Sequence, residues 1–101
     1  MLTTVNFHGS IARIILSGGM DYSTQDEIRE AYGKALSAEH VREIHVDFAD
    51  VPFIDSSCIR ALLILQKQAD ERGISLVLLN CHDLIREIFE VGGFDTMFTI
   101  R

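Results

Sequence analysis

Asp55-Ser56-Ser57 stands directly before a long apolar run with helical spacing that reaches Leu65. Aspartate and serine are common at helix N-termini, because their side-chain oxygens accept hydrogen bonds from the unpaired N–H groups of the first turn. The same N–H groups and the helix dipole also stabilise an anion such as a phosphate. The three residues therefore predict either a helix cap alone or a regulatory phosphorylation site at a helix start.

A phosphate on one of these serines would change the local charge by about −1.5 to −2. The helix N-terminus would stabilise part of that charge, whereas Asp55 and a second aspartate, Asp21, would repel it. A domain with both effects can fold in either state and present a different electrostatic face in each. The pattern is suited to a switch.

A nucleophilic serine is the rival chemical interpretation of this stretch. Such a serine needs a base within reach and usually a strained turn of the G-x-S-x-G type. The context here is Ile54-Asp55-Ser56-Ser57-Cys58, without flanking glycines. His82 is expected near the same surface, but nothing orients it as a base. The sequence does not favour an enzyme.

The two cysteines, Cys58 and Cys81, could be combined with His82 as zinc ligands. They lack the paired C-x-x-C spacing of zinc sites, so two free thiols are the better interpretation. We expect both to be reduced, and their places after consecutive strands would allow them to be neighbours. A thiol near a helix N-terminus can have a lowered pKa, and this stays open for Cys58.

Aspartates could also suggest magnesium binding, but caps and turns explain them better. They stand at positions 21, 47, 50 and 55. The sequence contains no Gly-rich phosphate loop of the G-x-x-x-x-G-K-[ST] type. We therefore expect no metal and no cofactor.

Strands and helices alternate along the chain, and they position the serines, aspartates and cysteines discussed above. Alternating or clustered apolar residues predict strands at 3–7, 11–16, 44–48, 74–79 and 97–100. Helical spacing predicts helices at 24–36, 56–72 and 83–91. Thr24 with Glu27 matches a capping box for the first helix, and Gly73 suits the end of the second. In the second and third helices, the residues expected to face the core of the domain are Ile59, Leu62, Leu63, Leu84, Ile85, Ile88 and Phe89.

This alternation predicts one α/β domain, with right-handed crossovers and a mixed sheet of four or five strands that is mostly parallel after an antiparallel first edge. Ligands and partners of such sheets gather at the carboxyl ends of the strands. Three polar segments, 21–24, 55–57 and 80–83, follow those ends. One surface should therefore hold Asp21, Thr24, Ser56, Ser57 and Asn80, with Cys58, Cys81 and His82 nearby.

Length and composition agree with a single small domain. The chain has 101 residues, 48% of them hydrophobic, and a formal net charge of −6. That charge argues against a nucleic-acid partner, which requires a basic face. The longest apolar runs are too short to span a membrane, and the first residues do not form a secretory signal. We expect a cytoplasmic protein.

The whole chain, 1–101, resembles a STAS domain, the fold of bacterial anti-sigma-factor antagonists. The central signature of that family is an extended segment followed by D-S-S-G-L-G. Residues 51–60 are similar to it, with Cys58 and Arg60 in place of the two glycines. Gly18-Gly19-Met20-Asp21 with Thr24 is similar to the family's G-x-L-D-x-x-T, and residues 93–100 are similar to its G-L-x-x-x-F-x-I.

The resemblance implies a partner switch and no enzyme activity. In such a switch the unphosphorylated antagonist binds an anti-sigma factor that is also a serine kinase, and a sigma factor is released. The kinase then phosphorylates the first serine after the aspartate, which is Ser56 here, and a serine phosphatase resets the system. The expected state is a monomer or weak dimer. The implied partner-binding residues are Asp21, Thr24, Asp55, Ser56, Ser57, Cys58 and Arg60.

A second interpretation of the same resemblance stays open. STAS domains also serve as constitutive scaffolds and as subunits associated with transporters. In that case Ser56 would only cap the helix, and no phosphorylation would occur.

Overall fold

The computed structural model describes residues 2–101, and its elements follow the predicted alternation. The strands are β1 (Leu2–His8), β2 (Ile11–Ser17), β3 (Glu43–Asp50), β4 (Ser75–Leu79) and β5 (Thr99–Ile100). A 3-10 turn, η1 (Tyr22–Thr24), leads into the first of three helices. These are α1 (Gln25–Ser37), α2 (Ser56–Glu71) and α3 (Asp83–Val91).

The five strands form one sheet in the order β1-β2-β3-β4-β5. β1 runs antiparallel to β2, and every later pair of neighbours is parallel. The predicted fold class, a mixed sheet with an antiparallel first edge and three helices, is confirmed. Because β2, β3 and β4 are parallel, the segments that follow them leave the sheet at the same end.

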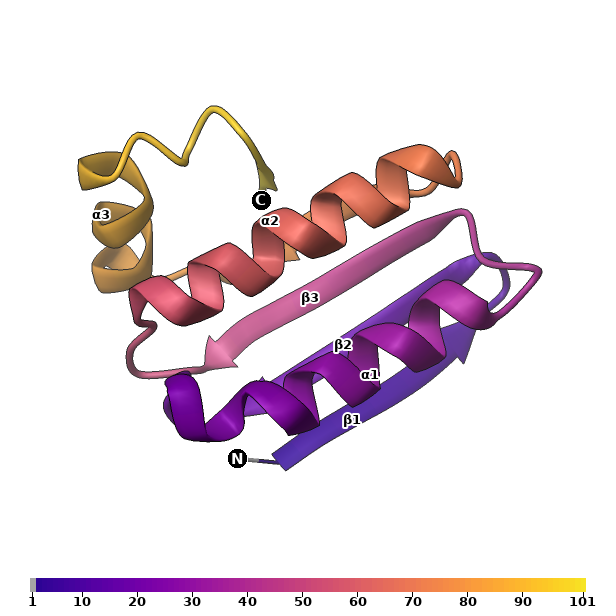
Figure 1. Ribbon diagram of the computed structural model, residues 1–101, viewed down its shortest axis with the longest axis horizontal. Coiled ribbons are helices and arrows are strands. Elements are labelled where there is room, and N and C mark those ends of the chain that lie inside the picture. Colours follow the sequence, from indigo (N-terminus) through magenta and orange to yellow (C-terminus); the bar gives the residue numbers. More distant parts are fainter. Residues whose placement is uncertain (1) are drawn as a thin grey trace.

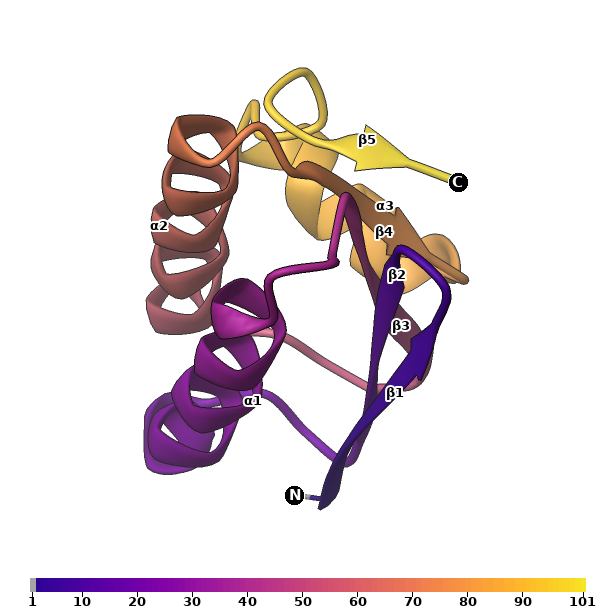
Figure 2. The ribbon, with the colours of Figure 1, turned by 90° about the vertical axis from the view of Figure 1, so that its right-hand side faces the viewer.

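α1 and α2 lie side by side over one face of the sheet, and α3 lies at the end where α2 begins (Figures 1 and 2). Strand alternation supplies the apolar surface beneath them. Phe89 of α3 meets Phe48 of β3 edge-on, with ring centroids 6.5 Å apart. The central strands bury Ala12, Ile14, Leu16, Ile44, Val46 and Phe48 completely.

The opposite face of the sheet carries polar side chains. Arg13 of β2 and His45 of β3 are register partners on it, and both are only partly buried. Asp47 is buried there and accepts from Arg13 Nη2 at 2.6 Å and from Asn80 Nδ2 at 3.0 Å. Although burial opposes its ionisation, these bonds and one from the Ala49 N–H lower the pKa of Asp47.

Two details of the predicted helices are wrong. Thr24 makes no capping bond to α1, because the chain first turns through η1 and the Thr24 hydroxyl bonds back to Asp21. Leu84 is 49% exposed, because α3 turns a narrow stripe of side chains, including Ile85 and Phe89, toward the core. Within residues 2–101, no helix combines the length and the apolar character needed to cross a bilayer.

Candidate functional site

Asp55 is the N-cap of α2. Its backbone is extended, and its Oδ1 accepts from the Ser57 hydroxyl at 2.5 Å and from the Cys58 N–H at 3.1 Å. The Ser57 bond is the main cause of a lowered pKa for Asp55; partial burial opposes it and the Cys58 N–H assists. An ionised carboxylate therefore fixes the first turn of the helix.

Ser56 is the first residue of α2, and it is exposed. Asp55, rather than Ser56, caps the helix. Within residues 2–101 the structure gives the Ser56 hydroxyl no hydrogen-bond partner, whereas the Ser57 hydroxyl is held by Asp55. Of the two serines, Ser56 is the one whose hydroxyl is exposed and not held by a described residue.

Asp21 and Thr24 form a second, similar cap at η1. Asp21 Oδ1 accepts from the Ser23 N–H at 2.9 Å and also from the Ser23 hydroxyl. The Thr24 hydroxyl accepts from the Asp21 N–H at 3.1 Å and donates to the Asp21 carbonyl at 2.9 Å. Thr24 is buried, so its hydroxyl shapes this turn while Asp21 stays partly accessible.

Backbone hydrogen bonds hold the two caps together. Met20 and Ile54 form a parallel bridge, in which the Met20 N–H donates to Phe53 O and the Asp55 N–H donates to Met20 O, each at 3.0 Å. The Cys58 thiol donates to the Asp21 carbonyl at 3.5 Å. The prediction that Asp21 and Ser56 lie at the same end of the sheet is therefore confirmed.

Side chains that the sequence did not single out complete this junction. Gln25 Nε2 donates to the Ser57 carbonyl at 3.1 Å, which ties the start of α1 to the start of α2. The Phe53 ring covers Gly19 so closely that a Cβ there would lie 2.2 Å from the ring. The glycine before Met20 was visible in the sequence, but no spacing rule connects it with Phe53.

The two thiols are both buried, and no disulfide joins them. Desolvation is the main reason that the pKa of Cys58 rises to about 11, and the nearby Asp55 charge adds to it. Burial likewise raises the pKa of Cys81 to about 11. The lowered pKa considered for Cys58 is wrong, because burial and the Asp55 charge raise it.

Arg60, Asn80 and His82 were also predicted at or near this surface, and the structure places each of them differently. Arg60 is exposed, one helical turn after Ser56 on the same side of α2. Asn80 follows β4 with a φ of 58°, and its amide is bound to Asp47 on the opposite face of the sheet. His82 Nε2 lies 2.7 Å from the Val51 carbonyl; since a carbonyl only accepts, that nitrogen carries the proton and is not a base for Ser56.

Polar groups of several kinds meet at this surface. Among residues 2–101, no group of three His, Cys, Asp or Glu side chains is placed to hold a metal ion. The surface offers the exposed Ser56 hydroxyl, the carboxylates of Asp21 and Asp55, and the exposed Arg60 guanidinium.

Residues 3–100 match the sequence model of the family described as Mlab, STAS domain. The match spans nearly the whole chain, so the protein belongs to the STAS domain family. The STAS-domain containing protein PA14_20770 of Pseudomonas aeruginosa (strain UCBPP-PA14) is 28% identical over 92 residues, which cover 91% of this chain and 89% of that protein.

Solved structures share the same fold. The anti-sigma factor antagonist SpoIIAA in its unphosphorylated form has a TM-score of 0.81 at 21% identity, over 99% of this chain and 88% of its own. Bacillus SpoIIAA in the phosphorylated form has a TM-score of 0.74 at 21% identity, over 99% and 91%. A sulfate transporter family protein from Wolinella succinogenes has a TM-score of 0.76 at 20% identity, over 87% of this chain and 70% of its own.

Proposed function

We propose that this protein is a cytoplasmic anti-sigma-factor antagonist without enzyme activity of its own. Its unphosphorylated form binds an anti-sigma factor that is also a serine kinase, and a sigma factor is released. Phosphorylation of Ser56 ends the binding, and a serine phosphatase restores it. The observation that carries the proposal is the exposed, unbonded Ser56 hydroxyl at the N-terminus of α2, next to the fixed carboxylate of Asp55.

The charge around Ser56 supports a switch that acts on the partner more than on the fold. The N–H groups of α2 stabilise a phosphate on Ser56, and Arg60 one turn later adds an opposite charge. Asp55, and Asp21 from the joined η1 cap, keep the surface acidic. Even a net penalty of about 2 kcal/mol at an interface weakens binding about 30-fold.

The partner surface in this proposal centres on Ser56 and Arg60, which are exposed, and on the partly buried Asp21, Asp55 and Ser57. Thr24 and Cys58 are buried, so they contribute by holding the two turns in place.

The test begins with the partner that co-purifies with the unmodified protein. Incubation with that partner and ATP should add one phosphate to the intact mass, located on Ser56. Calorimetry should then give Ser56→Ala the affinity of wild type and Ser56→Asp a weaker one. Ser57→Ala is the matched control and should still accept the phosphate. Equal affinities for Ser56→Ala and Ser56→Asp, or phosphate on Ser57 alone, would refute the assignment.

A second candidate is a constitutive scaffold or a transporter-associated subunit. The fold that this chain shares with a sulfate transporter family protein supports this second candidate. It requires that no kinase of the source organism phosphorylates Ser56, and that Ser56→Asp binds its partner as wild type does. The same mass and calorimetry measurements therefore separate the two candidates.

A further inference from the structure

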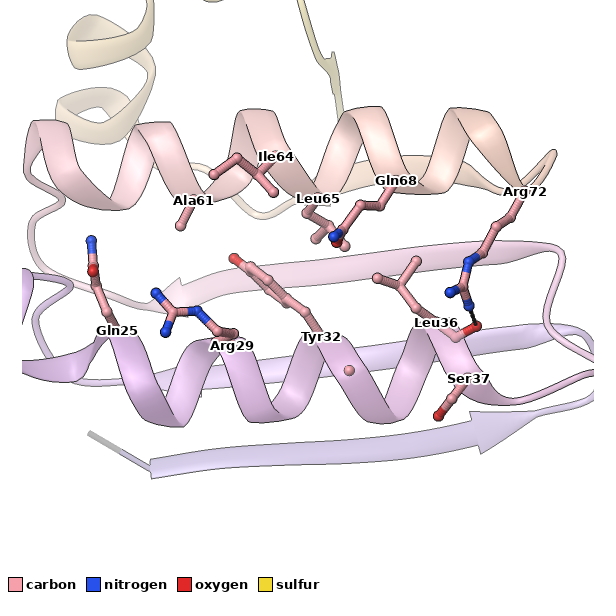
Figure 3. Close-up of a pocket in the computed structure, with 11 residues that line it drawn as sticks. Gln25, Arg29, Tyr32, Leu36, Ser37, Ala61, Ile64, Leu65, Gln68 and Arg72 are labelled. Carbon is pink, nitrogen blue, oxygen red and sulfur yellow. Dashed lines mark hydrogen bonds between the residues drawn. The ribbon is translucent and has the colours of Figure 1, made fainter.

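A cavity of about 350 Å³ lies between α1 and α2 and extends along the two helices from Gln25 to Arg72 (Figure 3). Two hydrogen bonds tie the helices together at its ends. Gln25 Nε2 donates to the Ser57 carbonyl at 3.1 Å, and Arg72 Nη1 donates to the Leu36 carbonyl at 2.6 Å. The size lies within the range of small-molecule sites in proteins, about 300–1,000 Å³. We call this cavity the interhelix slot.

One polar atom in the slot lacks a partner. Tyr32 is 5% exposed, and within residues 2–101 its buried hydroxyl makes no hydrogen bond. Figure 3 shows its ring pointing from α1 across to α2, between Ala61 and Leu65. Burial raises the pKa of Tyr32, so the group is a protonated hydroxyl that can donate. Buried donors are nearly always satisfied in native proteins, so this hydroxyl requires an acceptor that water or a ligand supplies.

The charge of the slot favours an anionic acceptor. Arg29 and Arg72 line it, and none of its described lining residues is Asp or Glu. The chain as a whole has 15 acidic and 9 basic residues, so the slot differs in charge from the rest of the molecule. The guanidinium of Arg29 forms a long, exposed ion pair with Asp26 at 3.6 Å, which a carboxylate in the slot can replace.

The rest of the lining is apolar. Leu36, Ala61 and Leu65 form the wall, and Ile64 beside them is 53% exposed. The lining residues of α1 run from 25 to 37, which is about 18 Å of helix at about 1.5 Å per residue. An extended hydrocarbon chain or a flat ring system fits along such a wall.

We propose that the interhelix slot binds a small amphipathic carboxylate. The carboxylate accepts from Arg29 and from the Tyr32 hydroxyl, and the apolar part of the ligand lies against Leu36, Ile64 and Leu65. Arg72 closes the far end through its bond to the Leu36 carbonyl. The slot adjoins the proposed switch through Gln25, which belongs both to its lining and to the Asp21–Asp55 junction; its other lining residues lie outside that junction.

Sodium decanoate, below its micelle concentration, is the probe. Calorimetry should show one saturable site, and amide shifts in a ¹H–¹⁵N spectrum should map to the slot. Arg29 is exposed, so Arg29→Gln should not disturb the fold. The substitution removes a charge-assisted hydrogen bond to the ligand and should weaken decanoate binding about tenfold or more. Tyr32→Phe should also weaken it. 1-Decanol, which has the same chain and no charge, should bind less tightly than decanoate.

Lys67→Gln is the matched control, because it removes a positive charge from an exposed position of α2 outside the slot. Its affinity for decanoate should equal that of wild type. The proposal is overturned if decanoate does not bind, if Arg29→Gln and Lys67→Gln bind it equally, or if the shifts map to another surface. None of these readouts depends on an anti-sigma factor, so they leave the proposed function untouched.

Discussion

At Asp55, one carboxylate oxygen holds both the Ser57 hydroxyl and the Cys58 N–H. The sequence indicated that Asp55, Ser56 and Ser57 would start a helix, because their types suit an N-cap. It could not assign the cap to one of them, since adjacent Asp and Ser residues are almost interchangeable at that position. Only the backbone geometry shows that Asp55 caps and that Ser56 is left free.

This assignment predicts different costs for two neighbouring alanine substitutions. Asp55→Ala removes the cap and should lower the free energy of unfolding by about 0.5–2 kcal/mol. Ser56→Ala removes an exposed hydroxyl without a partner and should change it by less than about 0.5 kcal/mol. Urea denaturation of both variants measures the difference. A cost for Ser56→Ala as large as that for Asp55→Ala would contradict the assignment.

Asp47 predicts how stability depends on pH. Its hydrogen bonds lower its pKa in the folded protein, so its ionised form stabilises the fold above about pH 4. That contribution is lost as the pH falls through the lower folded-state pKa. Asp47→Asn should therefore lower the free energy of unfolding at pH 7, by about 1–3 kcal/mol, and the gap to wild type should narrow at pH 3.

Denaturation at several pH values checks this, with Asp95→Asn as a control at an exposed position. A gap between wild type and Asp47→Asn that stays constant from pH 7 to pH 3 would show that ionisation of Asp47 is not the cause.

At the scale of elements, apolar periodicity predicted α2 well. Ile59 and Leu62 are buried as expected, and Leu63 is partly buried. The start of α1 was less predictable, because the chain makes η1 first and Thr24 serves that turn. β5 was expected at 97–100 but has two residues, since Met97 bonds back to Phe94 in a turn.

Leu62→Ala tests the packing of α2 on the sheet. Leu62 is 0% exposed, and the substitution leaves a cavity, so the free energy of unfolding should fall by about 2–5 kcal/mol. Ile64→Ala on the same helix is the control: Ile64 is 53% exposed, and its loss should cost less than about 1 kcal/mol. Similar costs for the two would mean that α2 is rotated from the position described.

At the scale of the whole molecule, the alternation of strands and helices was enough to predict the topology. The contacts that join distant segments were not predictable. Gln25 reaches Ser57, and Phe53 covers Gly19, through side chains whose own sequence neighbourhoods carry no signal. The interhelix slot was missed for the same reason, because helical spacing places Tyr32 in the core without showing that its hydroxyl lacks a partner.

The thiols report on the integrity of the whole fold. With a pKa raised to about 11, each has far less thiolate at pH 8 than a free cysteine, and both are buried. Alkylation of Cys58 and Cys81 by iodoacetamide should therefore be slow in the native protein and fast in urea. Intact mass over time measures it. Rapid labelling of either thiol in the native state would show that its burial is not maintained.

The two-residue ladder between β4 and β5 also has a consequence for the order in which the domain opens. β1 to β4 are joined by long ladders, so the amide protons that are hydrogen-bonded between these strands should exchange with solvent only when the whole domain unfolds. The segment from α3 to β5 can detach at the loss of few backbone bonds and return. The amide protons of this segment should exchange earlier. Cys81, which lies between β4 and α3, should become accessible before Cys58 does.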